Sequence, residues 1–154
     1  RRHNAACAVL AEWAEQECEC TVFREQVLPV ANPDHKQARM DLVVYSPLVA
    51  GAMHVDVTVV SALSVEALAK NSALCDGVAA KLAEADKTNK YPNCCLMPFA
   101  VEDHGRLGEA AISFIRLIAP GELARRSLAI GKLHQSLAAA LQRGSADAVI
   151  AACT

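Results

Sequence analysis

Two short valine-rich segments, joined by a connection that holds Pro47 and Gly51, constrain the fold more than any other feature of this sequence. Residues 40–46 (MDLVVYS) and 53–60 (MHVDVTVV) are rich in the β-branched residues that favour strands. Proline and glycine favour a reversal of the chain between them. We therefore expect two neighbouring strands joined by a hairpin-like connection.

The remaining sequence indicates helices around this pair of strands. Apolar residues recur at helical spacing on both sides of it, and Tyr91 with Pro92 ends the second long helix. The expected order is α-β-β-β-α-β-α-α, with no linker long enough to split the chain. The sequence therefore predicts a single α/β domain over residues 1–154, with a small mixed sheet flanked by helices and extra C-terminal helices. In chain order, the expected helices cover 3–18, 63–70, 76–90, 108–118, 122–142 and 145–152, and the expected strands 20–29, 40–46, 53–60 and 94–101.

Composition excludes several classes of protein. The 154 residues are 53% apolar and 21% charged, which is typical of a core-forming globular chain. The longest apolar stretches fall short of the roughly 20 residues that cross a bilayer, so we expect no membrane partner. A net charge of −2 excludes a uniformly basic coat for nucleic acid but allows a local basic patch. Because the sequence opens at Arg1 without methionine, we expect a fragment of a longer protein.

Seven cysteines occur at irregular spacings and include no CxxC pair. Secreted disulfide scaffolds and zinc ribbons use regular spacings, so we expect neither, and no zinc site. A reducing, intracellular compartment fits this pattern best.

The two central strands each hold one acid among apolar residues, Asp41 and Asp56. A buried carboxylate needs a partner, and two carboxylates on neighbouring strands repel one another unless a cation lies between them. Carboxylate oxygens suit Mg²⁺, which can activate water and stabilise charge on a phosphate. The alternative is that both aspartates lie at strand ends and meet water or an arginine.

Three residues at the end of the second long helix extend this pattern. Lys87 and Tyr91 are four residues apart and share one helical face, with Lys90 beside them. A lysine near the aspartates can hold a phosphate or orient the attacking water, and Tyr91 can add a hydrogen bond. The alternative is a solvated helix end whose lysines favour the helix dipole.

The strings RMDLVVY (39–45), HVDVTVV (54–60) and KTNKY (87–91) resemble the restriction-like endonuclease domain of site-specific non-LTR retrotransposons, a branch of the PD-(D/E)xK nucleases. The opening RRHN, FREQ at 23–26, PFAVEDHGRLGEAA at 98–111 and LAAALQRGSADAVIAA at 137–152 are similar to further parts of that domain. The resemblance covers nearly the whole chain, and the expected element order matches the αβββαβ core of restriction endonucleases.

The resemblance implies a metal-dependent DNA endonuclease that frees a 3′-hydroxyl for target-primed reverse transcription. It makes Asp41 and Asp56 the ligands of Mg²⁺, with Mn²⁺ as a substitute, and Lys87 the first and Lys90 the second choice of catalytic lysine. Met40 stands where the family usually has proline, and Thr58 where the wider superfamily has its lysine. Double-stranded DNA, a reverse transcriptase domain in the same polypeptide, element RNA indirectly, and a nuclear location are also implied.

Other polar residues have a less specific pattern. Glu25 lies just before the paired strands and is a third candidate metal ligand, with a salt bridge as the alternative. The run Glu102–His104 can ligate a metal in principle, but a polar strand exit is the simpler interpretation. The candidate DNA contacts are His3, Arg106, Arg125 and Arg126, each with a structural or solvated role as the alternative.

Two competing interpretations remain open. The first is that the chain keeps the nuclease fold but is catalytically silent and serves to bind nucleic acid or support assembly, since a fold does not fix a function. The second is an α/β domain of unrelated function.

Overall fold

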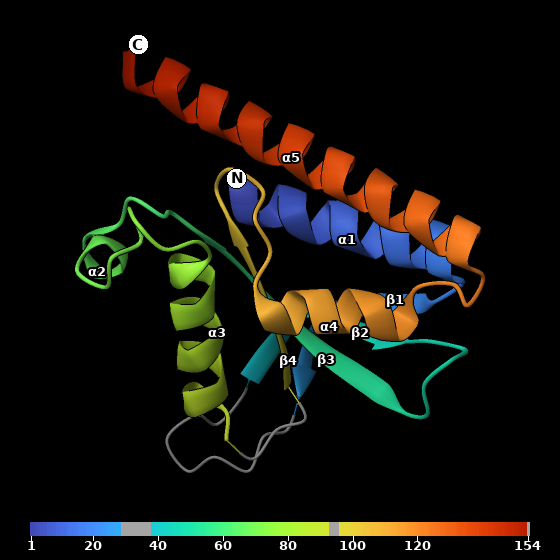
Figure 1. Ribbon diagram of the computed structural model, residues 1–154. Helices are drawn as coiled ribbons and strands as arrows, with labels where there is room; N and C mark the ends of the chain where they lie inside the picture. Colours follow the sequence, from blue (N-terminus) through green and yellow to red (C-terminus); the bar gives the residue numbers. More distant parts are fainter. Residues whose placement is uncertain (29–37, 93–95, 154) are drawn as a thin grey trace.

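A computed structural model describes residues 1–28, 38–92 and 96–153, and it confirms the predicted α/β architecture (Figure 1). A four-stranded mixed sheet is flanked by helices, and the chain ends in further helices. Residues 94 and 95, where the fourth strand was expected to begin, lie outside the described residues. The elements are α1 (Arg2–Cys18), β1 (Thr21–Leu28), β2 (Ala38–Tyr45), β3 (Ala52–Val60), α2 (Val65–Leu68), α3 (Val78–Lys90), β4 (Leu96–Glu102), α4 (Glu109–Ile118) and α5 (Leu123–Cys153).

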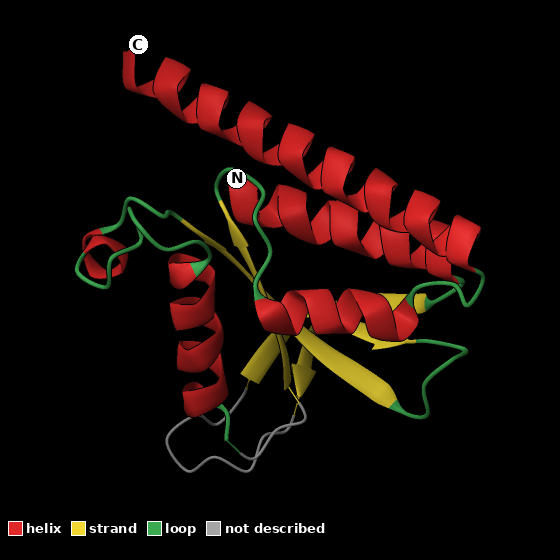
Figure 2. Ribbon diagram, in the orientation of Figure 1, coloured by secondary structure: helices red, strands yellow, loops and turns green. Residues whose placement is uncertain are grey.

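The strands lie in the order β1-β2-β3-β4. Figure 2 shows the sheet with the helices around it. The expected hairpin-like pairing of β2 and β3 is antiparallel, as is that of β1 and β2. β3 and β4 are parallel, and α3 lies on the connection between them. A crossover helix is the usual way to join two parallel strands.

The main core lies between the sheet and the helices α1, α4 and α5. Leu42, Val55 and Val57 point into this core from the two central strands, and Phe99 adds an aromatic ring from β4. α5 runs alongside α1, as Figure 1 shows, and Trp13 of α1 donates its indole N–H to the carbonyl of Ala129 at 2.7 Å. Because side chains alternate along a strand, Asp56 and its neighbour Thr58 face the other way, toward α3.

One expectation for the C-terminal region is wrong. The sequence predicted two helices separated by Gly144, but α5 continues through this residue to Cys153. A single glycine inside a helix costs only about 1 kcal/mol relative to alanine, which tertiary packing can offset. Gly144 lies where α5 meets the start of α1, and a Cβ there would come within 2.6 Å of Cγ of Arg2. The glycine therefore permits close helix packing and does not end the helix.

Two buried glutamates join α3 to its neighbours. Glu102, at the end of β4, is 1% exposed and accepts the N–H of Ala80 in the first turn of α3 at 3.3 Å. Glu84 of α3 accepts the N–H groups of Ala110 and Ala111 at 3.1 Å each, in the first turn of α4. Carboxylates at helix N-termini satisfy free N–H groups and favour the helix dipole. The polar run at Glu102 thus has a structural role, and His104 lies 3.2 Å from Glu102.

None of the helices in the described ranges has both the length and the apolar character needed to cross a membrane.

We predict that Gly108→Ala lowers the free energy of unfolding by about 2–4 kcal/mol, because it dislodges a buried capping carboxylate. A Cβ at residue 108 would lie 2.1 Å from Oε1 of Glu84. Urea denaturation measures the change. Gly131→Ala is the matched control, because a Cβ there meets nothing within 4 Å. Removing a helical glycine in α5 should raise stability by up to about 1 kcal/mol. Equal effects from both substitutions would contradict the prediction.

Candidate active site

Asp41 lies where the backbone pairing of β2 and β3 ends. The register runs from Tyr45↔Ala52 to Leu42↔Val55, and one further step would place Asp41 opposite Asp56. Instead of continuing the ladder, Oδ2 of Asp41 accepts the N–H of Val57 at 2.8 Å. The carboxylate takes the place of a main-chain acceptor, so the two aspartates lie on neighbouring strands as the sequence predicted.

Asp56 is bound by the lysine that the sequence analysis ranked first. Asp56 is 6% exposed, and its Oδ1 and Oδ2 accept from Nζ of Lys87 at 2.9 and 2.8 Å. Burial raises the pKa of Asp56 above its usual value, Lys87 opposes this rise, and the negative charge of Asp41 adds to it. The ammonium group of Lys87 therefore favours the ionised form of Asp56.

Lys87 reaches Asp56 from the helix α3. Thr58, two positions beyond Asp56 on β3, lines one cavity of about 300 Å³ together with Lys87. Within the described part of the chain, the Thr58 hydroxyl is the one buried side-chain oxygen or nitrogen without a hydrogen-bond partner.

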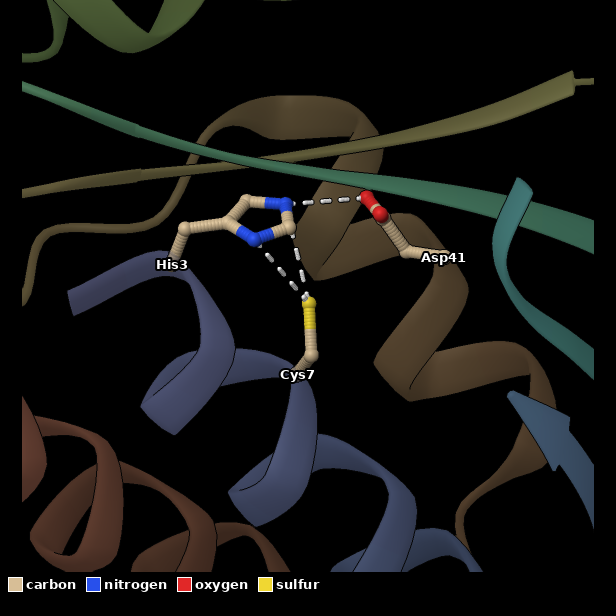
Figure 3. Close-up of side chains that lie close together, drawn as sticks. All are labelled: His3, Cys7 and Asp41. Atoms are coloured by element: carbon tan, nitrogen blue, oxygen red, sulfur yellow. Dashed lines mark hydrogen bonds and ion pairs between the residues drawn. The ribbon is translucent and has the colours of Figure 1, made fainter. Parts of the chain in front are cut away.

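His3 and Cys7, both on α1, lie beside Asp41 (Figure 3). Nε2 of His3 is 3.1 Å from Oδ2 of Asp41, and Sγ of Cys7 is 3.7 Å from the same nitrogen. Partial burial lowers the pKa of His3, but the hydrogen bond to Asn4 and the charge of Asp41 outweigh it, so the pKa is raised overall. Burial, with the charges of both aspartates, raises the pKa of the Cys7 thiol to about 12. Cys7 is therefore protonated at neutral pH and is a poor nucleophile.

Glu25 lies across from Asp41 on β1. The register brackets the two residues between Arg24↔Leu42 and Gln26↔Met40. Glu25 has a φ of 53°, the left-handed region that few residues other than glycine adopt. Its exposed carboxylate forms an ion pair with Arg39, which is the alternative that the sequence analysis left open. Glu25 and Asp41 nevertheless line one cavity of about 320 Å³, so Glu25 remains close to the site.

Lys90 and Tyr91 have different surroundings from Lys87. Nζ of the exposed Lys90 lies 5.3 Å from the centre of the Tyr91 ring. Tyr91 follows the last turn of α3 and packs against Met40 and Val43. The structure therefore brings Lys87, and not Lys90, to the aspartates.

The other candidate DNA contacts lie away from the aspartates. Arg125 pairs with Glu19 at 2.9 Å, and Glu19 lies about 24 Å along α1 from His3 at 1.5 Å per residue. Arg126 donates to the carbonyl of Pro120 at 2.8 Å. Arg106 pairs with Asp76 at 3.1 Å, just before α3 begins, while Lys87 lies near its end. Of the four candidates, only His3 belongs to the site.

Cys7, Asn4 and Arg24 line the cavity beside Asp41 but were not singled out from the sequence. The spacing of His3 and Cys7, four residues apart on one helix, was the available signal. This spacing indicates a site only when an acidic residue from a distant strand is known to lie beside His3 and Cys7.

The donor set of Asp41 and Asp56 fits a hard divalent cation. Both supply carboxylate oxygens from adjacent strands, and Mg²⁺ binds one or two such groups while it keeps several waters. The environment of Asp56 already favours a nearby positive charge, now supplied by Lys87. Asp41 and Asp56 would hold the cation, and Glu25 would have to leave Arg39 to join them.

Comparison with known protein families finds no family model that matches the chain, and no curated protein matches it. The resemblance to retrotransposon endonucleases therefore depends on the motifs of the sequence itself.

We predict that Asp56→Asn raises the free energy of unfolding at neutral pH. A carboxyl whose pKa is raised on folding contributes stability below its unfolded pKa, near 3.8, and loses it as the pH rises through the folded pKa. The neutral amide avoids that loss, so the gain in stability over the wild type should shrink toward pH 3.8.

Lys87→Met should instead destabilise the protein by about 3 kcal/mol at neutral pH, because it leaves a buried carboxylate unpaired.

Urea denaturation of the three proteins across this pH range checks the prediction. A loss of stability at neutral pH in Asp56→Asn as large as that in Lys87→Met would contradict it.

Proposed function

We propose that this chain is the endonuclease domain of a site-specific non-LTR retrotransposon, which nicks double-stranded DNA in a metal-dependent reaction. One observation carries the proposal: Asp41 from β2, Asp56 from β3 and Lys87 from α3 converge on one place. These are the residues that the resemblance implies as two metal ligands and a catalytic lysine. An aspartate pair on adjacent strands, with a lysine reaching one of them, is suited to phosphodiester chemistry.

The roles of the residues follow from their positions. Asp41 and Asp56 would hold Mg²⁺, or Mn²⁺ in its place, which supplies an activated water and stabilises the leaving 3′ oxygen. Lys87 is aimed at Asp56 and is 23% exposed, so it can turn its ammonium group toward a phosphate oxygen. His3 lies 44% exposed beside Asp41 and can contact the DNA backbone there.

The wider setting is part of the same proposal. The freed 3′-hydroxyl would prime reverse transcription by a reverse transcriptase domain in the same polypeptide, with element RNA as template, in the nucleus. The dispersed Arg106, Arg125 and Arg126 would need separate stretches of DNA, because α1 alone separates the Arg125 end from His3 by about 24 Å.

A catalytically silent nuclease fold is the second candidate, and the Lys87 contacts favour it. The ammonium group of Lys87 supplies a hydrogen bond to each carboxylate oxygen of Asp56. A fold that has lost its chemistry can keep such an ion pair for stability, and would then bind nucleic acid or support assembly.

We predict that the purified chain converts supercoiled plasmid to nicked circles with Mg²⁺ or Mn²⁺ and not with a chelator. Asp41→Asn and Asp56→Asn should abolish nicking, because each removes a charged ligand. Lys87→Met should lower the rate by about 100-fold or more, as for the loss of one donor that stabilises a transition state. Lys90→Met is the matched control on the same helix and should change the rate by less than about threefold, since Lys90 lies over Tyr91.

The outcomes separate the two candidates. Nicking that survives Asp56→Asn would exclude this site as the catalytic centre. Binding of DNA by a folded chain that shows no nicking and no binding of Mg²⁺ would favour the silent module. A greater loss in Lys90→Met than in Lys87→Met would reverse the assignment of the lysine.

A further inference from the structure

We propose that His3, Cys7 and Asp41 form a binding site for Zn²⁺ and that zinc bound there inhibits the nuclease by occupying Asp41. The proposal of a metal site depends only on the contacts among these three residues. The inhibition rests on the nuclease function proposed above, because it requires Asp41 to be a ligand of the catalytic cation.

The spacing of the ligand atoms suits one small tetrahedral ion. Zinc–nitrogen and zinc–oxygen bonds of about 2.0–2.1 Å and zinc–sulfur bonds of about 2.3 Å place tetrahedral ligands about 3.3–3.6 Å apart. Nε2 of His3 lies 3.1 Å from Oδ2 of Asp41 and 3.7 Å from Sγ of Cys7. All three ligand atoms lie within 4.8 Å of one another, so small side-chain shifts bring them around one ion.

Neighbouring groups orient two of these ligands. Nδ1 of His3 lies 3.1 Å from Oδ1 of Asn4, which leaves Nε2 facing Asp41. Sγ of Cys7 lies beside the imidazole ring, 3.7 Å from Nε2 and 3.9 Å from Nδ1. The N–H of Val57 fixes Oδ2 of Asp41 at 2.8 Å. Outer contacts of this kind hold metal ligands in place in known zinc sites.

The site is open to solvent, and it has room for a fourth metal ligand. His3 is 44% and Asp41 22% exposed, so an ion can enter from solvent. The three residues line the cavity of about 320 Å³, which leaves room for water as a fourth ligand. Arg24 lines the same cavity, and its charge opposes a cation, while Glu25 adds a negative charge.

The chemistry of the donors selects against Mg²⁺ and for zinc. A thiolate and an imidazole are soft or borderline ligands, and Mg²⁺ prefers oxygen donors. Zinc would displace the proton of the Cys7 thiol to form this thiolate, and the proton would pass to solvent. The two aspartates therefore take part in two sites of different character. Asp56 and Asp41 suit a hard cation, and Asp41 with His3 and Cys7 suits zinc. Asp41 is shared, so zinc withdraws it from the first site.

Cobalt(II) serves as the spectroscopic probe for the first part of the proposal. Titration of the reduced wild-type chain should give visible bands of tetrahedral intensity and a near-ultraviolet sulfur-to-cobalt band, both lost when zinc is added. Cys7→Ser should abolish the sulfur-to-cobalt band, and His3→Gln should weaken cobalt binding by at least about tenfold. Cys75→Ser is the matched control, because Cys75 is an exposed free thiol on the segment before α3.

A sulfur-to-cobalt band that Cys75→Ser leaves intact and Cys7→Ser removes would support the site. The site would be overturned if wild type gave no such band, or if Cys7→Ser kept it. If Cys7→Ser fails to fold by urea denaturation, His3→Gln decides, and unchanged cobalt affinity in that variant overturns the site.

Plasmid nicking with Mg²⁺ tests the inhibition. Zinc should lower nicking by the wild type by at least about tenfold at saturation, and Cys7→Ser, which keeps both aspartates, should resist zinc at the same concentration. Equal inhibition of both proteins would overturn the shared use of Asp41. Absence of nicking by both, with cobalt bound through Cys7, would overturn the inhibition together with the nuclease function, and would leave the zinc site supported.

Discussion

The hydrogen bond from the Val57 amide to the Asp41 carboxylate is the interaction on which the candidate site depends. It replaces a backbone contact at the point where β2 and β3 separate, and it fixes Asp41 between two strands and α1. A carboxylate that accepts a backbone amide is held more rigidly than one that reaches solvent on a free side chain. Asp56 lies within electrostatic reach of Asp41, because the charge of Asp41 raises the pKa of Asp56. The site is therefore built into the pairing of the sheet.

The buried glutamates explain how Lys87 stays in register with the aspartates. Glu102 holds the first turn of α3, and Glu84 joins the middle of α3 to the first turn of α4. α3 is thus joined directly to β4 and also to α4, which packs on β4. Lys87 lies three residues beyond Glu84, on a helix whose position along β3 and β4 is fixed. A slide of α3 by one turn would break three hydrogen bonds to buried carboxylates as well as the Lys87–Asp56 pair.

Much of this arrangement could be predicted from the sequence because it depends on local patterns. The valine-rich strands, the intervening Pro47 and Gly51, and the helical spacing before Tyr91 indicated the order of elements and placed Asp41 and Asp56 on neighbouring strands. The prediction of a helix end at Gly144 was wrong because two kinds of glycine look alike in sequence. One kind ends a helix, and the other allows a neighbouring helix to pack closely. The contact with Arg2 that distinguishes them joins residues 142 positions apart. The cluster of His3, Cys7 and Asp41 was hidden for the same reason, since the cysteine spacings alone contain no information about an acid on β2.

A metal cation at this site must compete with the positively charged and N–H groups that already contact the two aspartates. Lys87 pairs with Asp56, while His3 and the Val57 amide contact the same oxygen of Asp41. Any cation that binds both aspartates must compete with Lys87 for Asp56, whereas a cation that binds Asp41 with His3 and Cys7 leaves the Lys87–Asp56 pair intact. Breaking a buried ion pair costs free energy. In the free protein, binding of a cation to Asp41, His3 and Cys7 therefore costs less than binding to both aspartates. A phosphate that draws Lys87 away from Asp56 would remove that difference. In the proposed nuclease, the same geometry would favour an oxygen-bound cation once a phosphate has drawn Lys87 away, and zinc before that.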